Sequence, residues 1–157
     1  MRGDLLPYWE PNPDLPAAER AGWLGAAGRM AEGLGYLAHL PATVDADALV
    51  VAFPCADLRL AADYERAIRR ENVEARVVVA GNGVGVALPC RPDATDEEIK
   101  HCVLAGVKAA HAVEFIPITD PDVLEQLAAV QAIEACVVNF GRRLRGLGGG
   151  RRRAPRP

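Results

Sequence analysis

Long apolar runs and paired cysteines are both missing from this sequence. No stretch approaches the roughly 18 consecutive apolar residues of a membrane-spanning helix. The N-terminus carries prolines and acids where a signal peptide needs an apolar segment, so we expect a cytoplasmic protein that does not enter a membrane. Without a Cys-x-x-Cys pair, neither a disulfide framework nor a zinc site is indicated. The thiols that we expect to stay reduced are Cys55, Cys90, Cys102 and Cys136.

Motifs for nucleotide binding and hydrolysis are absent too. The stretch VVVAGNGVGVALPC (residues 77–90) has alternating glycines, whereas a dinucleotide-binding loop reads GxGxxG and leads into a helix. A P-loop needs Gly-Lys followed by Ser or Thr, and that is missing. No serine, histidine and acid constellation supports hydrolysis. The sequence therefore favours a protein that is not an enzyme and has no cofactor.

Charge is distributed unevenly along the chain. Seven of the 18 basic residues fall in the last 16 positions, which leaves 11 basic against 21 acidic residues in the rest. We expect residues 146–157 (GLGGGRRRAPRP) to form a disordered basic tail, because this composition cannot bury enough apolar surface to fold. Only this tail could contact nucleic acid, and it has no aromatic residues for base stacking.

The chain before residue 47 divides into two parts. Residues 1–16 hold four prolines and are expected to run extended across the surface. Apolar residues then recur at steps of three and four, which predicts a helix whose several glycines leave it dependent on tertiary contacts. The residues on its apolar face are Trp23, Ala27, Met30, Leu34 and Leu37.

Residues 47–118 alternate strand and helix patterns. DALVVAF predicts a strand, DLRLAADYERAIRREN an amphipathic helix, and VEARVVVAG with VGVALPC a hairpin. Thr95 and Glu98 form a capping box that starts a second helix, and VEFIPI predicts a last strand. The order βαββαβ is that of a ferredoxin-like split βαβ sandwich in the α+β class, with strand order 4-1-3-2. We expect one domain over residues 17–145, with this core, the extra N-terminal helix and a C-terminal helix that begins at Asp120.

The hairpin predicts two unlike sheet faces. With Asn82 and Gly83 at a type I′ turn, Val79 is expected to face Val86. The bulky face is expected to receive the helices between the strands. The opposite, small-residue face is too apolar to remain exposed, so we expect the terminal helices or a second subunit to cover it. Its predicted members are Val78, Ala80, Gly85 and Ala87.

Cys55 is the candidate reactive thiol. It follows a strand and precedes Asp57, the expected N-cap of a helix, where free amides and the helix dipole favour a thiolate. The alternative is a small buried hydrophobic residue, which free cysteines usually are, and the charge of Asp57 opposes the thiolate. Cys90, expected to be partly exposed after its strand, is the secondary thiol, and we expect no catalytic residues.

Part of the chain resembles two known families. Residues 49–118 are similar to the small Se/S carrier-like family through Phe53, Cys55 and the strand VGVALP, with Cys55 at the family's serine position. Val84 stands where that family has its cysteine, so the resemblance implies that only Cys55 could carry sulfur. ATDEEIKHCVLAGVKAA followed by VEFIP is similar to bacterial microcompartment shell domains, which implies assembly through subunit edges.

These observations leave three classes of function open. The first is a thiol carrier-like accessory protein for sulfur or selenium. The second is an oligomeric interaction module, and the third is a ligand-sensing domain without chemistry of its own. In each case we expect a homo-oligomer or a protein partner.

Overall fold

The computed structural model describes residues 4–81, 83–116, 121 and 124–125. The chain divides into two compact units, Met1–Ile118 and Thr119–Pro157, and the first contains the helices and strands named below. The expected C-terminal helix, Cys136 and the basic tail of residues 146–157 lie outside the described residues, apart from three positions near the start of that helix.

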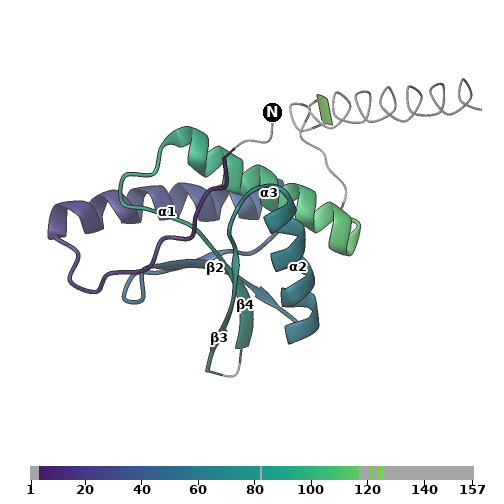
Figure 1. Ribbon diagram of the computed structural model, residues 1–157, viewed down its shortest axis with the longest axis horizontal. Helices are drawn as coiled ribbons and strands as arrows, with labels where there is room; N and C mark the ends of the chain where they lie inside the picture. The colour runs from purple at the N-terminus through teal and green to yellow at the C-terminus, as the bar shows by residue number, and fades with distance from the viewer. Residues whose placement is uncertain (1–3, 82, 117–120, 122–123, 126–157) are drawn as a thin grey trace, which may run out of the picture. The chain divides into compact units, whose positions relative to one another are not determined.

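The first unit is an α+β, ferredoxin-like domain, which confirms the predicted fold class (Figure 1). Its helices are α1 (Ala17–Leu37), α2 (Leu58–Arg70) and α3 (Asp96–Glu114). Its strands are β1 (Thr43–Asp45), β2 (Val50–Cys55), β3 (Arg76–Ala80) and β4 (Gly83–Leu88), in the sheet order β1-β2-β4-β3. All neighbouring strands are antiparallel. Among the described helices, none is both long and apolar enough to cross a membrane.

The predicted last strand, VEFIPI, is wrong for the part of it that the structure describes. Helix α3 continues through Glu114 and ends where Phe115 adopts a left-handed conformation, with its N–H directed to the carbonyl of His111. The place beside β2 that this strand was expected to take is filled by β1. The Asp45 side chain closes the β1–β2 turn by accepting hydrogen bonds from the amides of Asp47 and Ala48.

The β3–β4 hairpin forms, but two residues out of the predicted register. Ala80 pairs with Gly83, so the strands reverse between these two residues, and Gly81 takes a positive φ of +57°. Val86 therefore pairs with Val77 rather than Val79. A shift of two residues leaves every side chain on its predicted face, because side chains alternate along a strand.

The bulky face of the sheet forms the core with the helices. Phe53 packs edge to face on Tyr64 of α2, with ring centroids 5.1 Å apart. The largest core side chains on this face are fully or almost fully buried: Val51, Phe53, Val86 and Leu88. The capping box at the start of α3 is confirmed, since Thr95 Oγ1 accepts from the Glu98 amide and the Glu98 carboxylate accepts from the Thr95 amide.

Glycines allow α1 and α3 to pack closely. A Cβ atom added to Gly33 of α1 would lie 2.8 Å from Val103 Cγ2 of α3. A Cβ added to Gly106 of α3 would lie 2.5 Å from Leu34 Cδ2 of α1. Because Val103 and Leu34 are themselves buried, neither can move away freely.

On the small-residue face, one small residue is required by the pairing of strands within the sheet. Gly85 pairs with Pro54, and a Cβ at Gly85 would lie 2.7 Å from the carbonyl oxygen of Phe53 in the adjacent strand. Glycine is thus needed there for strand pairing, independently of any element that packs on the face. On the same face Ala87 is fully buried, whereas Val78 and Ala52 keep part of their surface exposed.

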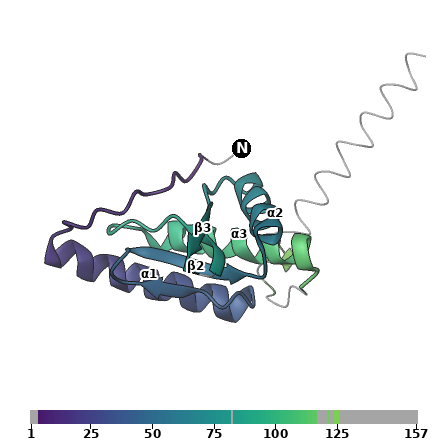
Figure 2. The ribbon, with the colours of Figure 1, turned by 90° about the horizontal axis from the view of Figure 1, so that it is seen from below.

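Residues 4–16, which we call the strap, are held against the sheet. Leu6 forms a parallel bridge with Val73, and the Tyr8 amide donates to the Glu74 carboxylate at 3.1 Å. The Arg76 guanidinium carbon lies 4.2 Å from the centre of the Tyr8 ring, and Arg76 also pairs with Glu10. Figure 2 shows the strap, in dark purple, leaving the start of α1 and crossing the width of the domain.

Candidate functional site

The predicted reactive thiol, Cys55, ends β2 and is half-buried. Asp57 caps α2 as expected, with its carboxylate accepting from the Leu60 amide at 2.8 Å. Burial raises the pKa of the Cys55 thiol to about 11, and the negative charges of Glu114 and Asp57 raise it further. The group is therefore a neutral thiol near pH 7, because desolvation and two carboxylates outweigh the helix dipole.

Glu114 and Tyr64 were not anticipated as neighbours of this thiol. The Tyr64 hydroxyl donates a hydrogen bond to the Glu114 carboxylate, and burial together with that bond raises the tyrosine pKa above its usual range. Glu114 reaches this position because it lies in the last turn of α3. The sequence patterns had assigned this residue to a strand, so its approach to Cys55 and Tyr64 could not be foreseen.

The other described cysteines are less accessible than Cys55. Cys90 was expected to be partly exposed, but it is buried, with 4% of its surface accessible. Cys102 is fully buried, and its Sγ lies 3.7 Å from the Pro89 carbonyl oxygen. Burial raises the pKa of both thiols to about 12. Across the described part of the chain, no three metal-ligating side chains gather into a group.

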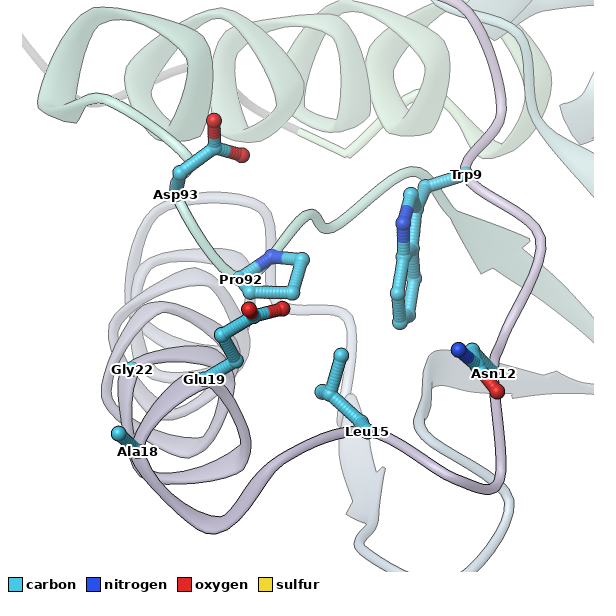
Figure 3. Close-up of a pocket in the computed structure, with 8 residues that line it drawn as sticks. All are labelled: Trp9, Asn12, Leu15, Ala18, Glu19, Gly22, Pro92 and Asp93. Atoms are coloured by element: carbon cyan, nitrogen blue, oxygen red, sulfur yellow. The ribbon is translucent and has the colours of Figure 1, made fainter.

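A second candidate site is a pocket of about 720 Å³, which we call the strap pocket (Figure 3). The strap, the start of α1 and the connection between β4 and α3 form its walls. Trp9, Leu15 and Pro92 supply its apolar surface, and Asn12, Glu19 and Asp93 supply its polar groups. Ala18 and Gly22 of α1 complete the described lining. The volume is within the range of small-molecule sites, about 300–1,000 Å³.

Three contacts fix the β4–α3 connection against α1 and the first turn of α3. The buried Trp23 indole N–H donates to the Cys90 carbonyl oxygen at 3.0 Å. Arg91 binds the Glu98 carboxylate at 2.7 Å, which ties the connection to the first turn of α3. A Cβ at Gly22 would lie 3.0 Å from the Pro92 carbonyl oxygen, so glycine permits the close approach. Pro92 is thereby held opposite Trp9 across the pocket (Figure 3).

The charged groups of the strap pocket are acidic. Glu19 makes no ion pair within the described residues, while Asp93 lies 3.6 Å from Arg91 Nε. Arg20, the neighbour of Glu19, binds the backbone carbonyls of Ala46 and Pro13. No basic side chain occurs among the described residues that line the pocket. The site is therefore suited to an uncharged or positively charged ligand.

Comparisons with known proteins identify only a shared fold. No protein-family model and no curated protein matches the chain. Serine palmitoyltransferase of Sphingomonas wittichii is similar over 64% of this chain and 26% of its own, with 16% identity and a TM-score of 0.53. A structure described as SPT with its PLP internal aldimine matches over 63% of this chain and 26% of its own, with 17% identity and the same TM-score. The S. paucimobilis enzyme with a PLP-myriocin aldimine is 21% identical, over 63% of this chain and 26% of its own, with a TM-score of 0.50. This chain thus spans about a quarter of the length of the solved structures that it matches.

Proposed function

We propose that this protein is a ligand-binding domain without chemistry of its own, and that its ligand site is the strap pocket. The observation that carries the proposal is the pocket itself: about 720 Å³ of space with an aromatic wall and a few polar groups in its lining. Sites of this kind bind small molecules through apolar contact and take specificity from a few polar groups. This proposal corresponds to the third class of function that the sequence left open, a ligand-sensing domain without chemistry of its own.

The PLP named for the structural neighbours does not fit this pocket. PLP carries a phosphate group, which proteins bind through basic side chains or several free backbone amides. Glu19 and Asp93 would repel the phosphate, and the described lining has no basic side chain to offset them. We therefore propose a ligand other than PLP, and we expect PLP to leave the chemical shifts of the lining residues unchanged.

Two phenylalanine substitutions, one inside the pocket and one outside it, test the proposal. Ala18 and Ala21 are both exposed on the first turns of α1, but only Ala18 lines the pocket. Ala18→Phe would narrow the cavity at its α1 wall, whereas Ala21→Phe adds the same side chain outside it. Ligand-observed NMR with a mixed fragment set should give hits on the wild type at roughly millimolar affinity. Ala18→Phe should abolish these hits and Ala21→Phe should retain them. The proposal fails if both variants retain the same hits.

A thiol carrier is the second candidate function, and it is supported by the accessibility of Cys55 relative to Cys90 and Cys102. A carrier thiol needs a substantial thiolate fraction near neutral pH. Because the pKa of Cys55 is raised to about 11, that fraction is small in the isolated domain. We therefore place ligand binding first.

A further inference from the structure

The strap pocket combines an aromatic face with carboxylates. Figure 3 shows the Trp9 ring edge-on, so that one indole face is turned toward Pro92 and Glu19 across the cavity. The negative face of an indole attracts a cation within about 6 Å of the ring centre, most strongly where water is partly excluded. A cation seated against Trp9 would therefore lie on the carboxylate side of the pocket.

Net charge at the pocket favours the same class of ligand. Glu19 and Asp93 contribute two carboxylates, and Arg91, outside the described lining, compensates only Asp93. The first turn of α1 has free backbone amides that would favour an anion, because Pro16 provides no side-chain cap. Glu19 lies in that same first turn, so its carboxylate offsets the positive end of the helix dipole. The balance at the cavity is negative.

We propose that the strap pocket binds a small organic cation, a protonated amine or quaternary ammonium group seated between the indole face of Trp9 and the carboxylate of Glu19, with Asp93 adding negative charge at the rim. This inference rests on the binding function proposed above and names the ligand class of that site. Asn12, at the edge of the pocket, has an amide that can bond to a polar group carried by the same ligand.

Three probes of equal bulk test the ligand class. They are choline, its uncharged isostere in which carbon replaces nitrogen, and tert-butylacetate as the anion. Titration calorimetry at low salt should show choline binding at least about tenfold more tightly than the isostere, with no measurable binding of the anion. Raising the salt concentration should weaken choline binding and leave isostere binding unchanged.

Matched variants assign the effect to the pocket. Glu19→Gln should weaken choline binding about fivefold or more, whereas Glu32→Gln, the same change further along the exposed face of α1, should not. Trp9→Leu keeps an apolar wall but removes the ring, so it should weaken choline roughly tenfold and the isostere less. Trp9→Phe should restore part of the affinity.

The outcomes separate this inference from the proposed function. If the isostere or the anion binds as well as choline, and Ala18→Phe abolishes that binding, the pocket is a ligand site but the cation inference is wrong. If no probe and no fragment binds in a manner that depends on Ala18, both proposals are wrong. Equal effects of Glu19→Gln and Glu32→Gln would also overturn the cation inference.

Discussion

At the scale of single residues, Cys55 shows how a thiol beside a helix start can have a raised pKa. Its pKa of about 11 follows from burial and from the carboxylates of Glu114 and Asp57. We expect iodoacetamide to modify Cys55 at neutral pH far more slowly than a free thiol, with a rate that rises toward pH 11. Cys90 and Cys102 should react later still, and mainly after unfolding. Mass spectrometry of each cysteine over a pH series measures this order.

Removing charge near Cys55 provides the control. Glu114→Gln should lower the Cys55 pKa and speed its alkylation near pH 9, while Glu97→Gln, an exposed acid in the first turn of the same helix, should not. Alkylation of the wild type at the free-thiol rate near pH 7 would contradict the structure and favour the sulfur-carrier hypothesis.

Tyr64 leads to a prediction about alkaline stability. In the folded state the pKa values of Tyr64 and Cys55 are raised, so the unfolded chain releases these protons at lower pH than the folded one. The free energy of unfolding should therefore be highest below about pH 9 and should fall as the pH rises toward 11. Tyr64→Phe should cost about 1 kcal/mol at pH 7, from the lost bond to Glu114, and should make the alkaline decline shallower. Urea unfolding at each pH measures both effects; an equal slope in the variant would contradict the assignment.

At the scale of elements, the glycines of α1 divide into two kinds. Gly28 has open space around an added Cβ, so Gly28→Ala should raise the free energy of unfolding by up to about 1 kcal/mol through helix propensity. Gly33 faces Val103, so Gly33→Ala should lower it by about 1–3 kcal/mol despite the same gain in propensity. Thermal unfolding of both variants measures these opposite changes in stability. A stabilised Gly33→Ala protein would show that α1 and α3 are not packed this closely.

The elements also show what the sequence could predict. Long amphipathic patterns identified α2, and the capping box identified the start of α3, because both depend on neighbouring residues. β1 has three residues, too few for a periodic pattern, and its place was assigned instead to the strand-like VEFIPI. The start of that segment, Val113 and Glu114, continues α3, since tertiary contacts override the β propensity of Val113.

The strap pocket could not be predicted from the sequence, because it too depends on contacts between residues far apart in the chain. Its lining comes from residues 9–22 and from Pro92 and Asp93, which only the tertiary fold brings together. The proline-rich strap has no periodicity that would indicate which of its side chains face inward. Cys55 was correctly placed at a strand end beside a helix cap, but its ionisation depends on Glu114, which lies 59 positions later in the chain.

At the scale of the whole molecule, covering of the small-residue face by terminal helices or a second subunit stays a prediction. If a second subunit covers the face, the wild type should sediment as an oligomer, and Val78→Arg, which places a charge on the face, should sediment as a monomer. Val79→Arg is the matched control, because Val79 is on the opposite face of the same strand and 69% exposed. A monomeric wild type, or equal dissociation by both variants, would contradict assembly through this face.

The order of strands in the sheet also has a consequence for the folding pathway. The outer pairs, β1–β2 and β3–β4, are hairpins closed by short turns, and such hairpins form within about 1–10 microseconds. The central pair, β2–β4, joins one hairpin to the other, and its formation closes a loop that contains α2. The Leu6–Val73 bridge closes a longer loop still. Contacts that close long loops slow folding. We therefore expect the rate-limiting step of folding to be the pairing of the two preformed hairpins, and docking of the strap, which completes the pocket, to come last.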